Sequence, residues 1–125
     1  MALLLANKGY DVFLGTGRGN YFSDKHETIE NHTKEFWDFS YDDLKHDIEA
    51  FLLTIKKITK SNKVHYVGHS QGAVAILAAL SDSDEEPRKT IHKMTDKIIL
   101  MSPVVYTVSS YLITLRKAFL ISLRT

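Results

Sequence analysis

The sequence predicts an α/β fold with three parallel strands and flanking helices. Three short apolar segments carry the strand prediction: residues 10–14, residues 64–67 and Thr95–Met101. Stretches with helical periodicity or helix-forming composition separate them. Strands that alternate with helices along a chain are typical of a parallel sheet with right-handed crossovers.

The first twenty residues predict a helix end, a strand and a turn. Residues 1–7 have the composition of the last turns of a helix that begins before the chain does, and Gly9 suits the position that ends it. Residues 10–14 are then expected to form a short strand. The glycine-rich stretch 15–20 lacks the glycine spacing and the lysine of a phosphate-binding loop, so a tight turn is expected there.

Residues 21–39 predict a polar connection. Its aromatic residues are expected to pin it to the core; they are Phe22, Phe36, Trp37 and Phe39. The triplet Asn31-His32-Thr33 fits the N-glycosylation sequon, which matters only in a secreted protein. A chance match stays open at this point.

Ser40 is expected to cap a long amphipathic helix that runs to about Lys60. Asp42 and Asp43 fall in its first turn, where acidic residues favour the positive end of the helix dipole. Apolar residues recur at helical spacing on one face: Leu44, Ile48, Phe51, Leu52, Ile55 and Ile58. The charged residues between them are expected to point outward: Lys45, Glu49, Lys56, Lys57 and Lys60.

The central motif is Gly68-His69-Ser70-Gln71-Gly72, which fits the nucleophile-elbow pattern G-x-S-x-G. The pattern alone is weak, but here it lies between a predicted strand and an apolar helix over 73–80, as an elbow requires. In such a turn the serine is held in a strained conformation above the sheet. Side chains at the two glycine positions are expected to collide with the turn.

The rest of the chain predicts a loop, a strand and a helix. Residues 81–89 are expected to form a solvated loop, Thr95–Met101 the third strand, and residues 108–123 a final helix. Ser102 and Pro103 close the third strand.

Composition limits the class of protein. The chain has 125 residues, a 44% hydrophobic and 25% charged composition, and a net charge of +1, which argues against a nucleic-acid or anionic-membrane surface. Without cysteine it has no disulfide and no thiolate metal site. The first six residues lack the features of a signal peptide, and no apolar run reaches the length of a membrane helix.

In one register from residue 1 to about 105, the chain resembles the acid lipases, the gastric and lysosomal group of the α/β-hydrolase superfamily. The likeness rests on Leu5–Val12, Arg18–His26, Lys34–Asp43, Tyr66–Gly72 and Ser102–Val104. It implies a secreted or lysosomal lipase that hydrolyses triacylglycerols or sterol esters, without a cofactor or metal. It also implies that Ser70 is the nucleophile and that the Gln71 backbone N–H is one oxyanion donor.

The resemblance also implies what else such an enzyme needs. The three strands correspond to the fourth to sixth of the family sheet, so residues 1–105 are expected to be the central part of the domain, and 106–125 the start of its cap or lid. The second oxyanion donor and the triad Asp and His are expected outside a partial chain. Asp82 or Asp84 with His92 has the right order but is expected to lie too far from Ser70. His69 is poorly placed as the base, and His26 is expected to anchor its loop.

Two other interpretations stay open. The chain could be a non-catalytic relic or scaffold that keeps the elbow without a working triad. It could also come from another serine hydrolase, such as a thioesterase or an acyltransferase, because fold and elbow do not fix the substrate.

Overall fold

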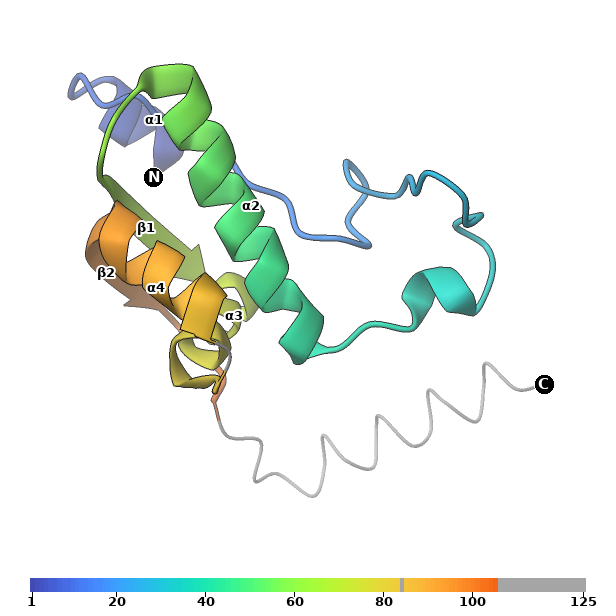
Figure 1. Ribbon diagram of the computed structural model, residues 1–125. Coiled ribbons are helices and arrows are strands. Elements are labelled where there is room, and N and C mark those ends of the chain that lie inside the picture. Colours follow the sequence, from blue (N-terminus) through green and yellow to red (C-terminus); the bar gives the residue numbers. More distant parts are fainter. Residues whose placement is uncertain (84, 106–125) are drawn as a thin grey trace.

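Two parallel strands lie at the centre of the chain (Figure 1), in a computed structural model that describes residues 1–83 and 85–105. Strand β1 (Val64–His69) pairs in parallel with β2 (Thr95–Met101), with Tyr66 opposite Ile98 and His69 opposite Met101. The two strands therefore end side by side, and Ser70 follows directly after the end of β1. The prediction of a strand over Thr95–Met101 is confirmed.

Three helices cover one face of this sheet (Figure 1): α2 (Tyr41–Thr59), α3 (Gln71–Ser81) and α4 (Glu85–Met94). Their apolar side chains form one buried cluster: Leu44, Ile48, Leu52, Ala75, Ile76, Ala79, Ile91 and Met94. Tyr66, Ile98 and Leu100 pack against it from the strands. On the other face of β2, Ile99 and Met101 are exposed. The core therefore lies between the sheet and these helices.

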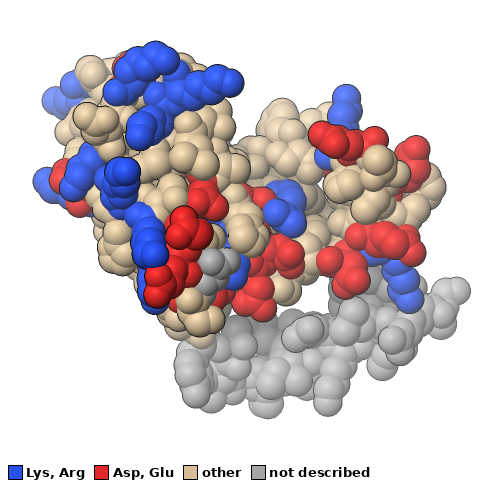
Figure 2. All heavy atoms as spheres, viewed as in Figure 1, with Lys and Arg blue, Asp and Glu red and all other residues tan. Residues whose placement is uncertain are grey.

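Helix α2 begins as predicted. Ser40 is its N-cap in a capping box: the Ser40 N–H donates to the Asp43 carboxylate at 2.8 Å, and the Ser40 Oγ accepts from the Asp42 N–H at 3.2 Å. Acidic side chains lie in its first turn, whereas Lys56 and Lys57 lie in its last. Figure 2 shows the same separation at the surface, with basic side chains gathered towards the end of α2 and acidic ones around its start.

Two details of this helix differ from the prediction. Lys45 and Glu49 do not point to solvent, because α3 and α4 pack beside them: the Lys45 Nζ lies 2.8 Å from the Asp82 carboxylate, and Glu49 accepts from the Thr90 hydroxyl at 2.7 Å. Ile58 is 64% exposed, since it lies near the helix end beyond the packed cluster.

The predicted strand at residues 10–14 is not confirmed. Among the described residues the sheet has two strands, and the backbone of 10–14 joins neither. An extended segment becomes a strand only by pairing its backbone groups with a neighbour. Here Tyr10 instead contacts β1 through its side chain, with its ring edge-on to the His65 ring and 6.5 Å between the ring centroids. The preceding helix α1 (Ala2–Ala6) and the left-handed Gly9 that follows it agree with the prediction.

The predicted loop over 81–89 is only half correct, because α4 begins at Glu85. Two signals favour a helix there: Glu85 and Glu86 lie in the first turn, and a proline is tolerated in a first turn, where its missing N–H has no partner to lose. Pro87, Ile91 and Met94 share one buried face. The predicted helix over 108–123 lies outside the described residues.

Residues 15–39 leave the helical layer and run out past the start of α2 (Figure 1). They include a short 3-10 helix, η1 (Glu35–Trp37). The aromatic residues do not all pin this segment to the core: Phe39 packs against the buried cluster, but Phe22 is 79% and Trp37 52% exposed.

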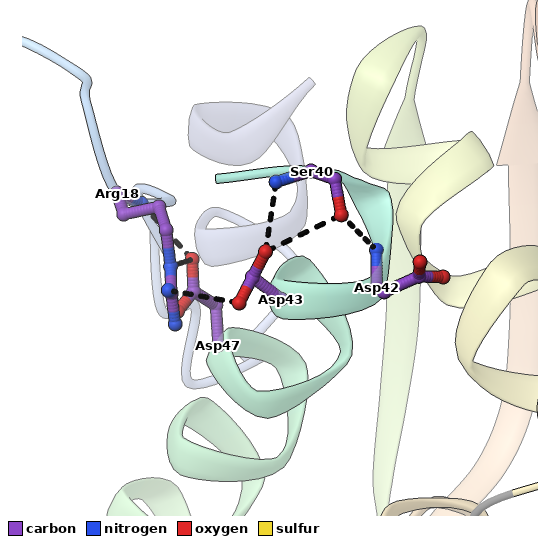
Figure 3. A network of polar contacts seen from close by, with 5 residues as sticks. All are labelled: Arg18, Ser40, Asp42, Asp43 and Asp47. Atoms are coloured by element: carbon purple, nitrogen blue, oxygen red, sulfur yellow. Dashed lines mark hydrogen bonds and ion pairs between the residues drawn. The ribbon is translucent and has the colours of Figure 1, made fainter. Parts of the chain in front are cut away.

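Polar contacts hold this segment instead, as Figure 3 shows. The Arg18 guanidinium makes a two-pronged contact with Asp47, with Nη2 to Oδ1 at 2.8 Å and Nε to Oδ1 at 3.0 Å. The Arg18 backbone N–H also donates to Asp47, and Asp43 lies 3.9 Å from the guanidinium. These carboxylates raise the pKa of Arg18 above its ordinary value, the Asp47 hydrogen bond most.

Candidate active site

The turn between β1 and α3 has the geometry of a nucleophile elbow. Ser70 lies at φ 50°, ψ −113°, a backbone conformation that residues other than glycine rarely adopt. Such a backbone costs about 1–3 kcal/mol and persists only where the surroundings enforce it. Strained non-glycine residues of this kind cluster at functional sites, so Ser70 is the first candidate for a reactive group.

The neighbouring strand enforces this conformation. The Ser70 N–H donates to the Met101 carbonyl at 2.9 Å, which ties the elbow to the end of β2. The Ser70 carbonyl accepts from the Ala73 and Val74 N–H groups, both at 3.1 Å, and so opens α3. The Ser70 side chain makes no capping hydrogen bond to its own helix.

The two glycines of the motif have different reasons to be glycine. A Cβ at Gly68 would lie 2.8 Å from the Ala73 nitrogen and 2.8 Å from the Gly72 carbonyl oxygen, both rigid backbone atoms. The expected collision is therefore confirmed for Gly68. At Gly72 it is wrong: the nearest atom to a Cβ there would be the Tyr66 hydroxyl, at an ordinary 3.7 Å.

Tyr66 supports the turn from beneath. Its hydroxyl donates to the Gly72 carbonyl at 2.9 Å. Burial raises the pKa of Tyr66 to about 12, so the phenol stays protonated and can donate at any physiological pH. The sequence patterns did not predict this role of Tyr66. A tyrosine two residues before an elbow glycine, on the face that points to the helix, is the signal that could have found it.

Gln71 is the first residue of α3. Its N–H belongs to the first helical turn, whose N–H groups have no intrahelical acceptor and carry the positive end of the helix dipole. The side chain of Gln71 is exposed. The backbone at this position therefore has the features that an anionic oxygen beside Ser70 would need.

The acid and base that sequence order offers are not near Ser70. Asp82 caps the far end of α3, and eleven helical residues of about 1.5 Å each place it roughly 17 Å away. There it pairs with Lys45, while His92 lies exposed on α4. Asp84 lies outside the described residues. The expectation that this set does not form a triad is confirmed for Asp82.

Two other histidines are also accounted for. His69 is exposed at the end of β1. The His26 Nδ1 accepts from the Thr28 and Ile29 N–H groups, at 3.2 and 3.1 Å, so this ring anchors its own loop as expected.

One histidine–carboxylate pair was missed by sequence reasoning. His65 Nδ1 lies 3.4 Å from the Asp96 carboxylate, because each is the second residue of its strand and the strands start together. It cannot serve Ser70: five strand residues of about 3.3 Å each put it roughly 16 Å away, at the opposite end of the sheet.

A cavity of about 430 Å³ lies between the segment 18–39 and the start of α2, lined among others by Arg18, His26, Phe36 and Asp47. Neither Ser70 nor Gln71 lines it. A nucleophile must touch its substrate, so this cavity is separate from any chemistry at the elbow. Within residues 1–83 and 85–105, no cluster of three or more His, Asp or Glu residues is arranged to bind a metal ion.

Comparison with known proteins now places the chain. Residues 1–109 match the family model for the alpha/beta hydrolase fold. The chain belongs to this family. A search of solved structures found no match.

The chain is also similar to acid lipases, so the resemblance seen in the sequence is confirmed. It is 37% identical over 108 residues to a tear acid lipase-like protein of Mesocricetus auratus, covering 83% of this chain and 25% of that protein. It is 42% identical over 86 residues to the lysosomal acid lipase/cholesteryl ester hydrolase of Homo sapiens, covering 68% and 22%. Human lipase member K is 41% identical over 90 residues, covering 71% and 23%. The chain therefore spans about a quarter of the length of these relatives.

Proposed function

We propose that this segment is the nucleophile-bearing part of a lipase of the acid lipase type, which hydrolyses a lipid ester through an acyl-Ser70 intermediate. The strained Ser70 at the β1–α3 turn is the observation that carries the proposal. The similarity to acid lipases supports the substrate class. The activity is proposed for a protein that carries the triad acid and base together with this segment.

In the proposed reaction the Ser70 Oγ attacks the ester carbonyl carbon, and its proton passes to the general base. The carbonyl oxygen becomes an oxyanion, which the Gln71 N–H at the start of α3 would stabilise. Collapse of this intermediate breaks the bond to the alcohol, which leaves with the proton from the base. Water then attacks the acyl-Ser70 ester, releases the fatty acid and restores the serine.

The three strands of the sequence analysis also stay part of this proposal. In the family sheet a further strand would pair with the free edge of β1 and residues 10–14 would join the sheet. Residues 1–105 would then form the central part of the hydrolase domain, and 106–125 would lead into the cap. We also propose the secretory route for this protein, since a lysosomal acid lipase is among its relatives.

A fluorophosphonate probe tests the assignment of the nucleophile. We expect the probe to label Ser70, and Ser70→Ala to abolish labelling without lowering the melting temperature. Ser102→Ala is the matched control, because Ser102 also has a positive φ, 47°, at the end of the neighbouring strand. Labelling that survives Ser70→Ala, or that is lost in Ser102→Ala, would contradict the proposal.

The oxyanion donor needs a change that removes an N–H and little else. An amide-to-ester exchange of the backbone at Gln71 does this, because the oxygen that replaces the nitrogen carries no hydrogen, whereas a proline at this position would also restrict the backbone of Ser70. We expect kcat for a soluble ester to fall about 10²–10³-fold, as for other lost oxyanion donors. Gln71→Ala keeps the N–H and should retain nearly full activity. Melting temperatures of both variants check that each protein stays folded. Equal activity of the two variants would reject the Gln71 N–H as an oxyanion donor.

No helix within residues 1–83 and 85–105 combines the length and the apolarity needed to cross a bilayer.

A further inference from the structure

The turn that carries Asn31 is the second site on this chain with a defined chemistry. The Thr33 N–H donates to the Glu30 carbonyl at 3.1 Å, which closes a four-residue turn with Asn31 and His32 at its centre. The Thr33 hydroxyl donates to the same carbonyl at 2.9 Å. Asn31 and His32 are both exposed. The turn depends on contacts among four consecutive residues, so it can form before the rest of the chain folds.

The sequence of this turn is that of an acceptor for N-linked glycans, which requires Asn, any residue except Pro, then Ser or Thr. The chain has four asparagines, and Gly9, Phe22, Thr33 and Val64 stand two residues after them. Only Asn31 therefore meets the requirement. Its exposure in a local turn distinguishes it from a sequon hidden in a strand or a core helix.

We propose that Asn31 carries an N-linked glycan that stands beside Trp37. The proposal rests on the secretory route given under the proposed function. The Asn31 amide nitrogen bonds to the first sugar carbon of a lipid-linked oligosaccharide pyrophosphate. The bond from that carbon to the pyrophosphate oxygen breaks, the lipid pyrophosphate leaves, and the amide loses one proton.

The surroundings of Asn31 give the glycan a place and a physical role. The Trp37 indole N–H donates to the Asn31 backbone carbonyl at 2.7 Å, so the ring lies next to the glycosylated residue. This ring is 52% exposed, and it contacts the Phe36 ring edge-on, with 5.1 Å between the ring centroids. Apolar rings gathered on a surface promote association between molecules. A hydrated oligosaccharide at Asn31 would keep this part of the surface apart from other chains.

The test is expression of the full-length protein through the secretory pathway of a eukaryotic host. We expect peptide N-glycosidase to lower the apparent mass and to turn Asn31 into aspartate, which peptide mass spectrometry detects. Asn31→Gln and Thr33→Ala should migrate as the enzyme-treated protein does, whereas Thr33→Ser should keep the glycan. A protein without any shift, or a shift that remains in Asn31→Gln, would overturn the proposal.

The position beside Trp37 has its own readout, because Trp37 is the single tryptophan of these 125 residues and a Trp37→Phe variant identifies its share of the emission. Removing the glycan should shift its fluorescence emission, and the treated protein should then match Asn31→Asp, which has the same residue without a sugar. An unchanged emission would overturn the placement beside Trp37. Fluorophosphonate labelling of Ser70 on the same samples separates the two proposals. Labelling of a protein without a glycan would refute only the glycan at Asn31. A glycan on a protein that is not labelled would refute only the assignment of Ser70 as nucleophile.

Discussion

The elbow half of the molecule and the segment 15–39 are held together by different forces. Around the elbow, side chains from three helices and both strands form one buried cluster. In the segment 15–39 no residue is buried, and Tyr21 is 83% exposed. This segment is held by hydrogen bonds and ion pairs, chiefly from Arg18 to Asp47 and from Trp37 to Asn31. A strained serine needs a rigid support, and the apolar half provides it. We expect the two halves to fail under different perturbations.

The largest effect should come from the core under α2. Leu52 is 1% exposed, and Leu52→Ala removes apolar contacts and leaves a cavity, which should lower the free energy of unfolding by about 3 kcal/mol. Leu53 is the matched control, because it is the next residue and is 50% exposed; Leu53→Ala should cost less than about 0.5 kcal/mol. Urea unfolding of both variants measures this. Equal losses would mean that this face of α2 does not form the core.

The second effect separates the two elbow glycines. Gly68→Ala forces a Cβ against backbone atoms of Gly72 and Ala73, and we expect a loss of about 2 kcal/mol. Gly72→Ala meets ordinary contact distances and places a better helix former in α3, so its melting temperature should not fall. Thermal unfolding distinguishes them. A Gly72→Ala variant as unstable as Gly68→Ala would show that the turn is tighter than these distances imply.

The third effect concerns the segment 15–39 alone. Arg18→Met keeps much of the apolar stem but removes the paired hydrogen bonds to Asp47, at a cost of roughly 1 kcal/mol because the pair is partly exposed. The cost should appear as local opening, with tryptic cleavage after Lys25 about fivefold faster and the global melting temperature nearly unchanged. Arg18→Lys keeps the charge but cannot form the two-pronged contact. Its tryptic cleavage rate should therefore lie between those of the wild type and of Arg18→Met. A global loss of stability in Arg18→Met would show that the halves unfold together.

The same contrast explains what the sequence could predict. The apolar half follows from local patterns: helical spacing in α2, the Ser40 cap, and a strand–glycine–serine–helix run at the elbow. These patterns predicted the strained strand-to-helix turn at Ser70, which the structure shows; the role of Ser70 as nucleophile stays a prediction. The helix α4 was missed because charged residues and a proline dominate its first turn, and its apolar face shows only in Pro87, Ile91 and Met94.

Several of the predictions that the structure corrects or does not confirm share a cause, which is pairing between residues far apart in the chain. Residues 10–14 have strand composition, but a strand also needs a partner, and composition does not name one. The contacts of Lys45 with Asp82 and of Arg18 with Asp47 span 37 and 29 residues. The sequence of a single helix predicts that its charged residues face solvent. It does not show which of them contact a neighbouring element in the folded chain. The His65–Asp96 pair was missed for the same reason, since it depends on the register of two strands.

A smaller effect should appear at alkaline pH and belong to the elbow. Burial raises the pKa of Tyr66 from 10.0 to about 12. Because the folded pKa is the higher one, its contribution to stability is complete below the unfolded pKa and is lost as pH rises towards the folded value. We expect the melting temperature to fall between about pH 9 and about pH 12 more in the wild type than in Tyr66→Phe. Tyr21→Phe, which alters an exposed ring, should behave as the wild type.

The smallest effect should appear at acid pH and belong to the start of α2. The Ser40 backbone hydrogen bond, with smaller help from the Ser40 hydroxyl, Arg18 and His46, holds the pKa of Asp43 below its ordinary 3.8. Since the folded pKa is the lower one, the stabilisation is present above 3.8 and is lost as pH falls through the folded value. Asp43→Asn should therefore be less stable than the wild type at neutral pH, and this difference should close in acid. Asp42→Asn is the control, because Asp42 meets Ser40 through its backbone N–H, so its acid transition should follow the wild type. A difference between Asp43→Asn and wild type that stays constant across acid pH would show that the capping box, and with it the junction between the two halves, does not depend on this charge.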